Sequence, residues 1–163
     1  LNGIMKYLIE KTGGNIHDNG TINISSNSIY GSNYEPKNLV DYDQNNYYQS
    51  NYDNDIYIRF DFKKIKIQPE NYSIKSYPGG QGSGNLRNWV VEVSNDCNDW
   101  KIVDQHSNDS TLNNTSVIST FNIKKLDSFY QYIQIRQTGK SWRNDNMIYF
   151  PSIEFYGKFI EAQ

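Results

Sequence analysis

The amino-acid sequence predicts an all-β fold, a jelly-roll β-sandwich of about eight antiparallel strands preceded by a short N-terminal helix. Residues 56–62 and 132–136 alternate apolar and polar side chains with the period of two that is typical of half-buried strands. Only 36% of the 163 residues are hydrophobic, but 15% are aromatic, including 14 Tyr. Such chains bury area through aromatic and β-branched side chains on pleated faces. No helical crossover separates the expected strands, which favours antiparallel pairing.

The first predicted element is a helix over residues 1–11. Five apolar side chains recur there at helical spacing: Leu1, Ile4, Met5, Leu8 and Ile9. Gly13 and Gly14 supply the stop. Because so short a helix is marginal alone in water, its apolar face must pack on something. We expect residues 1–14 either to cap the sandwich, which then covers residues 15–163, or to be the end of a preceding domain.

The remaining strands are expected where short apolar segments lie between clusters of turn residues. The expected strands are residues 56–62, 65–67, 72–75, 89–93, 101–103, 117–123, 132–136 and 152–156. A glycine-rich loop at 78–84, a turn at 96–99 and a long polar segment at 104–116 connect them.

Composition and the rare residue types argue against several classes of function. The formal net charge is −2 and no cationic run is present, so nucleic acid is not an expected partner. No apolar stretch approaches the length of a membrane span. The two histidines, His17 and His106, lie beside no recognisable nucleophile, and we expect both to be exposed. We therefore predict that the chain is not an enzyme.

Five segments resemble, in order, the motifs of one known family. Residues 38–50 are similar to its D-G-D-x-x-T-x-W-x-S signature and residues 55–62 to its W-L-x-V-D-L-G strand. Residues 88–96 match its W-x-V-E-x-S-x-D strand, residues 129–136 its R-Y-I-R-I strand, and residues 153–157 its closing E-I-E-x-x-G. On these motifs, residues 25–158 resemble the discoidin, or coagulation-factor type C, family with its galactose-binding-like β-sandwich. The single cysteine and the helix favour the intracellular multidomain branch of that family.

The resemblance also implies one structural calcium ion. Asp41 would be a side-chain ligand, Asn38 and Asp43 would offer backbone oxygens, and Glu154 would complete the site with Asn46, which stands where the family usually has Thr. Tyr42 stands where the family usually has Gly. The alternative is that Asp41 and Glu154 bond only to loop amides, as in an ordinary polar turn.

Three loops at one end of such a sandwich are candidates for a ligand site: residues 50–54, 76–87 and 137–146. A sugar needs an aromatic face for its C–H surface and fixed polar groups for its hydroxyls. The candidate ligand-binding residues are Tyr52, Tyr77, Arg87, Lys140, Trp142, Arg143 and Asn144. The basic members of this set can equally pair with an acidic peptide. Trp142 is alternatively a packing residue beneath its own loop.

Together these observations predict a non-catalytic recognition module that binds carbohydrate through its end loops. The alternative is an intracellular adaptor domain that binds another protein. Cys97 is the only cysteine, so no internal disulfide can form, which favours the cytoplasm. Six N-x-S/T sequences leave an extracellular location as the alternative.

Overall fold

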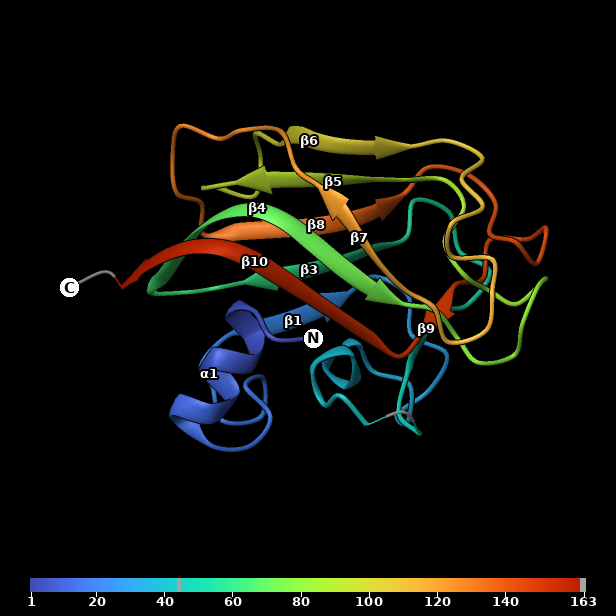
Figure 1. The fold of residues 1–163 in the computed structure, drawn as a ribbon, viewed down its shortest axis with the longest axis horizontal. Coiled ribbons are helices and arrows are strands. Elements are labelled where there is room, and N and C mark those ends of the chain that lie inside the picture. The colour runs from blue at the N-terminus through green and yellow to red at the C-terminus, as the bar shows by residue number, and fades with distance from the viewer. Residues whose placement is uncertain (44, 162–163) are drawn as a thin grey trace.

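The structure is a computed structural model that describes residues 1–43 and 45–161 (Figure 1). These residues form ten strands, one α-helix and one 3-10 helix. In chain order the elements are α1 (Ile4–Thr12), β1 (Asn23–Ser26), η1 (Pro36–Val40), β2 (Tyr48–Gln49), β3 (Tyr57–Asp61), β4 (Ile65–Lys75), β5 (Trp89–Ser94), β6 (Lys101–His106), β7 (Ile118–Asn122), β8 (Tyr132–Gln137), β9 (Tyr149–Phe150) and β10 (Ser152–Glu161).

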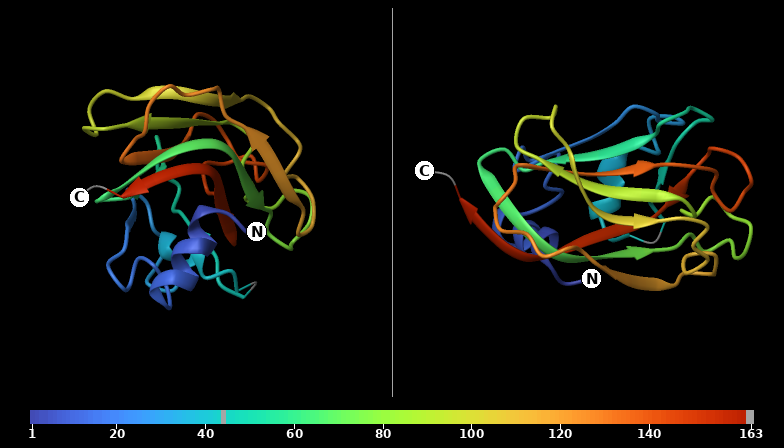
Figure 2. Two further views of the ribbon diagram at one scale, coloured as in Figure 1. Left: turned by 60° about the vertical axis from the view of Figure 1, so that its left-hand side comes forward. Right: turned by 90° about the horizontal axis from the view of Figure 1, so that it is seen from above.

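The strands pair in three antiparallel sheets, which confirms the predicted all-β sandwich. One sheet has the strand order β1-β3-β8-β5-β6 and a second has the order β10-β4-β7. A short ribbon pairs β2 with β9. Figure 2 shows the two larger sheets as layers that face each other, with α1 beside β10. The core between them is rich in aromatic rings; Phe60 and Phe155, for example, meet edge to face with centroids 5.2 Å apart.

The structure differs from the prediction in how the strands are divided. Residues 65–67 and 72–75 belong to one strand, β4, which pairs with β10 along its whole length. Pro69 suggested a break because proline cannot donate a ladder hydrogen bond. A bulge between Tyr156 and Gly157 accommodates it: Gly157 has a φ of 143°, and a Cβ there would lie 2.3 Å from the Gln68 carbonyl oxygen. The strands β1, β2 and β9 were not predicted, because they are too short to show a period.

Helix α1 belongs to the same core as the sandwich. It spans Ile4–Thr12 rather than 1–11 and ends at Gly13, whose φ is 78° and whose N–H donates to the Ile9 carbonyl. Its apolar stripe is buried in the core, and the Tyr7 ring lies 5.1 Å from that of Phe159 in β10. No helix among the described residues is long and apolar enough to cross a membrane.

Candidate functional site

The connections that follow β4, β6 and β8, and the one that precedes β3, gather at one end of the sandwich (Figure 1). We call this the loop end. Backbone hydrogen bonds tie its segments together: Trp142 N–H donates to the Asn85 carbonyl at 3.2 Å, and Tyr149 N–H to the Gly84 carbonyl at 2.9 Å. The three loops predicted to carry the ligand site therefore meet there.

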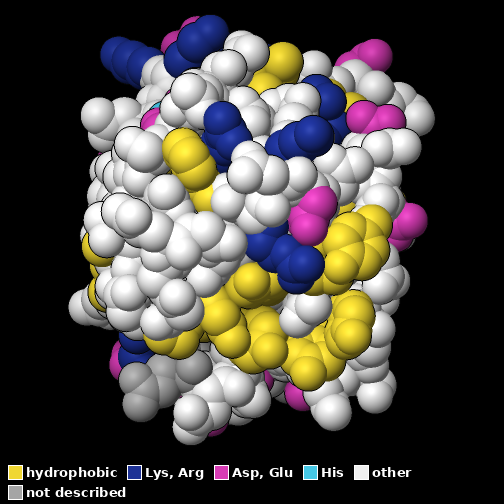
Figure 3. Space-filling view, turned by 90° about the vertical axis from the view of Figure 1, so that its right-hand side faces the viewer, with side chains coloured by type: hydrophobic (Ala, Val, Ile, Leu, Met, Phe, Trp, Pro, Cys, Tyr) yellow, Lys and Arg dark blue, Asp and Glu magenta, His cyan; other side chains and the backbone are white. Residues whose placement is uncertain are grey.

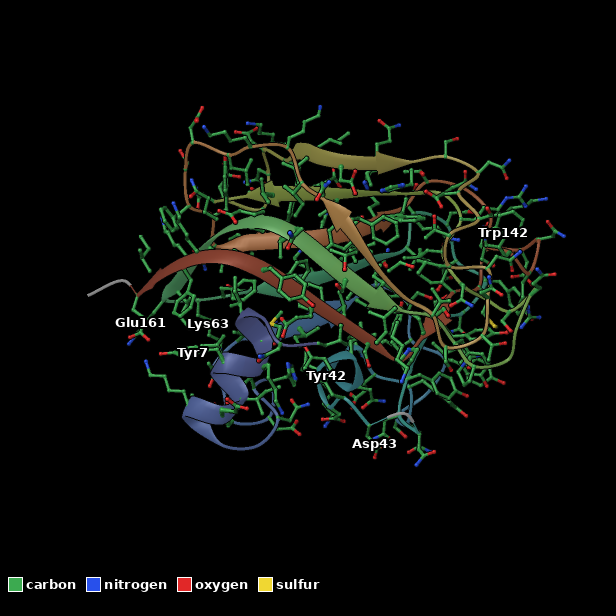
Figure 4. The ribbon with its side chains drawn as sticks, viewed as in Figure 1. Tyr7, Tyr42, Asp43, Lys63, Trp142 and Glu161 are labelled. Carbon is green, nitrogen blue, oxygen red and sulfur yellow. The ribbon has the colours of Figure 1, made fainter. Side chains whose placement is uncertain are left out.

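Trp142 lies at the loop end, where Figure 4 labels it, and is half-buried. Its indole Nε1 donates to the Asp109 carbonyl at 2.9 Å. The Arg87 guanidinium lies 4.4 Å from the ring centroid and covers part of that face. Arg87 also donates to Asn108 at 2.7 Å and to Asn144 at 3.1 Å. Trp142 therefore helps to hold its own loop and is partly exposed.

The other predicted ligand-binding residues do not form one site. Arg143 donates to the Tyr52 hydroxyl at 3.3 Å and pairs with Asp145 at 3.1 Å, and Tyr52 is 61% exposed. Lys140 is exposed, and its carbonyl accepts a hydrogen bond from the Asn88 side chain. Tyr77, which was also predicted to bind the ligand, packs instead into a group of aromatic rings.

This group is a tyrosine cluster that the sequence reasoning missed except for Tyr77. The Tyr77 ring lies 4.7 Å from that of Tyr149 and 5.1 Å from that of Tyr47. Tyr47 is followed by Tyr34 at 5.3 Å, and Tyr34 by Tyr30 at 5.4 Å. Figure 3 shows apolar side chains gathered on this face of the molecule. Burial, reinforced by Tyr77 and Tyr34, raises the pKa of the Tyr47 hydroxyl. The abundance of tyrosine in the sequence was the only signal for the cluster.

A polar pocket of about 310 Å³ lies beside the exposed Tyr52 at the loop end. We call it the loop-end pocket; its lining residues are Asp53, Asn54, Asp55, Gln137, Thr138, Gly139 and Asn146. The Asn146 side chain donates to the Asn54 side chain at 2.9 Å, which joins the two loops that form its rim.

The predicted metal ligands lie on the helix side of the molecule, where Figure 4 labels Tyr42 and Asp43. Glu154 is fully buried in β10. Its carboxylate accepts backbone N–H groups from Gly3, Met5 and Lys6 at 2.8–2.9 Å, and from Phe155 at 2.8 Å. It therefore binds the N-terminus of α1, where unpaired N–H groups and the helix dipole favour a negative charge.

The remaining predicted ligands make hydrogen bonds within and beside their own loop. Asp41 accepts the side-chain amides of Asn15 at 2.6 Å and Asn46 at 3.4 Å. The predicted ligand oxygens of Asn38 and Asp43 are their backbone carbonyls, which accept the N–H groups of Asp41 at 3.2 Å and Asn46 at 3.0 Å. The Asn38 side-chain amide donates to two backbone carbonyls, and the Asp43 carboxylate accepts the Asn45 N–H.

Tyr42 fills the space between this loop and β10. It has a φ of 54°, which suits the glycine of the family motif, and its hydroxyl donates to the Ile153 carbonyl at 2.9 Å. Burial and then the nearby charge of Glu154 raise the pKa of its hydroxyl. Among the described residues, no group of three or more His, Cys, Asp or Glu side chains is placed to hold a metal ion. The Glu154 carboxylate already accepts N–H groups of the protein itself, and calcium binding stays a prediction.

The order of the motifs and the sandwich geometry agree with a comparison against known families. The family model for the F5/8 type C domain matches residues 21–150. The chain belongs to that family.

Solved structures similar to this F5/8 type C domain include binding modules of the same fold. One is CpGH89CBM32-5 of Clostridium perfringens in complex with GalNAc-β-1,3-galactose, with 12% identity over 85% of this chain and 96% of that chain and a TM-score of 0.65. Another is the family 32 CBM of NanJ from C. perfringens in complex with galactose, with 11% identity over 86% and 95% and a TM-score of 0.63. A third is chitosan-binding module 1 from a chitosanase/glucanase of Paenibacillus sp. IK-5, with 13% identity over 84% and 96% and a TM-score of 0.66.

A curated relative comes from a different class of protein. The E3 ubiquitin-protein ligase hecd-1 of Caenorhabditis elegans is 27% identical over 98 residues, which are 59% of this chain. The chain spans 4% of the length of that relative.

The two histidines of the F5/8 type C domain are not exposed as the sequence suggested. His17 is half-buried, and its Nδ1 accepts the Ile24 N–H at 3.0 Å. His106 is stacked on Trp89, with ring centroids 4.3 Å apart. The expectation was wrong because both imidazoles are held by residues of the fold itself.

His106 lies between two carboxylates. Its Nε2 is 2.8 Å from Asp104 and its Nδ1 is 2.8 Å from Asp109. The two carboxylates therefore hold the imidazole from both ring nitrogens and fix its orientation against Trp89. Burial acts to raise the pKa of Asp109, but hydrogen bonds from Thr111 and His106 outweigh it and the pKa is lowered. The backbone carbonyl of Asp109 in turn holds Trp142.

Proposed function

We propose that this F5/8 type C domain is a non-catalytic recognition module that binds carbohydrate at its loop end. The observation that carries the proposal is that aromatic rings and polar groups share one face. Exposed or half-buried tyrosines offer flat apolar surface for the C–H faces of a sugar ring. Arg143, Asn144 and the loop-end pocket offer hydrogen-bonding groups beside them.

The fold comparison supports the same proposal. Two of the similar structures hold galactose-containing ligands, and a third is named as chitosan-binding. Their sequence identities to this chain are between 11% and 13%, so the property they share with it is the fold. Carbohydrate binding by this chain is our proposal.

The test is a glycan-array screen of the folded domain, run with calcium and again with excess chelator. A double variant, Tyr30→Ser with Tyr52→Ser, removes the most exposed ring of the tyrosine cluster and the exposed tyrosine of the loop end, which are 53% and 61% exposed. Tyr7→Ser is the matched control, because Tyr7 is 46% exposed but lies on α1. We expect the double variant to lose at least ten-fold in affinity and the control to bind as the unaltered domain does. If a folded sample binds no glycan, the proposal is overturned.

A second candidate function is recognition of a protein partner inside the cell. The similarity to a ubiquitin ligase and the apolar tyrosine cluster favour it. Cys97 as the only cysteine supports a cytoplasmic location, which we also propose. Absence of glycans from the six N-x-S/T sequences of the native protein, measured by mass spectrometry, is the expected result. An occupied site would place the domain in the secretory pathway.

A further inference from the structure

The rings of the tyrosine cluster form a row rather than a compact group. From Tyr30 through Tyr34 and Tyr47 to Tyr77, successive ring centroids lie 5.1–5.4 Å apart. Among the described residues, Tyr30 contacts no aromatic ring except Tyr34, so the row is extended at that end. At the other end, Tyr149 lies 4.7 Å from Tyr77 and 6.3 Å from Tyr47. Figure 3 shows the apolar side chains of this face as a continuous band.

The backbone beside the rings is shaped to hold them. A Cβ at Gly84 would lie 2.5 Å from the Tyr149 ring, and one at Gly79 would lie 3.0 Å from the Tyr77 ring. A side chain at either glycine would therefore displace a ring of the cluster. These contacts hold the rings in place before any ligand arrives, which reduces the entropy cost of binding.

The hydroxyls of the cluster are available to a ligand. Among the described residues, no hydrogen bond joins any of the five to a group outside the cluster, and none is an unpaired atom of the interior. The core tyrosines differ in this respect. Tyr48 donates to the Ser28 carbonyl at 2.7 Å. Tyr72 donates to the Asp104 carboxylate at 2.6 Å. A buried tyrosine hydroxyl usually has a partner in the protein, whereas those of the cluster reach solvent.

The cluster offers rings and hydroxyls but no net charge. A tyrosine hydroxyl is neutral near pH 7 and both donates and accepts hydrogen bonds. Arg143, the cation beside Tyr149, already pairs with Asp145 at 3.1 Å. A ligand that matches this surface therefore has apolar faces and hydroxyls of its own and needs no charge.

We propose that the tyrosine cluster binds a linear β-1,4-linked chain of neutral sugars along several consecutive units, rather than a single terminal sugar. When the ring hydroxyls of such a chain are equatorial, each unit presents a flat C–H face to an aromatic ring. The ring spacing of 5.1–5.4 Å is close to the length that one unit adds to the chain. This inference rests on the proposed carbohydrate function and names its ligand class.

The experiment measures how affinity depends on chain length, by isothermal titration calorimetry. The probes are the dimers and pentamers of β-1,4-linked glucose and of β-1,4-linked N-acetylglucosamine. In at least one series we expect the pentamer to bind ten-fold or more tightly than the dimer, because it contacts more rings. Equal affinities, or a glycan array that reports only other sugars, would overturn this inference and leave the proposed function standing. If these probes and the whole array give no binding, both fail.

The row is tested at its exposed end. Tyr30→Ala removes that ring, and Tyr7→Ala is the matched control because Tyr7 is 46% exposed on α1. We expect at least a five-fold loss of pentamer affinity with Tyr30→Ala and less than a two-fold change with the control. Equal affinities of the two variants would overturn the inference. Sedimentation velocity of the same samples should show a monomer. A dimer that Tyr30→Ala dissociates would assign this face to a second copy of the chain and also overturn it.

The hydroxyls are tested separately from the rings. Tyr34→Phe combined with Tyr47→Phe keeps both rings, and we expect an unchanged Tm with at least a five-fold loss of pentamer affinity. Tyr48→Phe is the control, because it removes a hydroxyl that bonds to Ser28 inside the protein. We expect this control to lower the Tm and to leave pentamer affinity unchanged. Unchanged affinity in the double variant would overturn the role of the hydroxyls.

Discussion

Two buried polar side chains, Glu154 and Gln137, show how different the two sides of this F5/8 type C domain are. Glu154 is 0% exposed and its carboxylate accepts four backbone N–H groups, three of them from the first residues of the chain. Gln137 is 6% exposed, and its amide nitrogen has no acceptor among the described residues. A buried group with all its partners inside the protein stabilises the fold, whereas a buried donor without an acceptor lowers its stability.

The comparison assigns opposite roles to the two sides. On the helix side, Tyr42 and the start of α1 fill the position that resembled a metal site. The polar groups there therefore bond to other groups of the protein. On the loop end, the Asp53 and Asp55 carboxylates and the Tyr52 ring are exposed. We therefore expect substitutions on the helix side to change stability and substitutions on the loop end to change binding.

The largest expected effect is that of Glu154→Ala. The variant leaves the N–H groups of Gly3, Met5 and Lys6 without their acceptor, and each buried unpaired group costs about 1–3 kcal/mol. We expect the free energy of unfolding, measured in urea, to fall by more than about 3 kcal/mol. Asp41→Ala is the control, because Asp41 is exposed, and we expect a change within about 1 kcal/mol. Equal losses in both variants would instead indicate one shared site.

The next effect concerns Asp109, which links the core to the loop end through His106 and Trp142. Its lowered pKa means that its contribution to stability is present above the unfolded value of about 3.9 and is lost as the pH falls through the lower folded value. We expect Asp109→Asn to lose about 1–3 kcal/mol at pH 7. The deficit should shrink as the pH approaches 3, which urea unfolding across this range measures. A deficit that stays constant with pH would contradict the charged contact with His106.

Trp142→Phe is expected to have a smaller effect on stability. It keeps an aromatic ring beneath Arg87 but removes the hydrogen bond to Asp109, which is worth about 0.5–1.5 kcal/mol. We expect a loss in that range by thermal or urea unfolding, with glycan affinity changed by less than three-fold. A large loss of affinity at unchanged stability would place Trp142 in the ligand site and move the site away from the tyrosine cluster.

The sequence predicted the sandwich because strand periodicity is a local property. Residues 56–62 and 132–136 show it clearly, and both form strands of the larger sheet. The same pattern could not show which strand-end residue lacks a partner. Gln134 and Gln137 look alike in the sequence, yet Gln134 donates to Glu92 at 3.0 Å, whereas the Gln137 nitrogen donates to nothing among the described residues.

The role of Glu154 was equally hidden, for a different reason. Its partners lie about 150 positions away in the sequence, at the start of α1, so no spacing rule connects them. The sequence motif around Glu154 could be recognised. That its carboxylate accepts the N–H groups of α1 depends on where this helix packs, which the motif does not show. The tyrosine cluster likewise joins residues from separate segments of the chain, and only the abundance of tyrosine was visible in the sequence.

The smallest expected effect is that of calcium on the unaltered domain. An ion present at 100 times its Kd would add about 2.7 kcal/mol to the stability if it bound only the folded state. Because the Glu154 carboxylate already accepts four N–H groups and Tyr42 fills the adjacent space, we expect no measurable difference in Tm between millimolar calcium and excess chelator. A clear rise in Tm with calcium would show that an ion can replace the N–H groups of α1 at Glu154. The assignment of a purely structural role to the helix side would then be wrong.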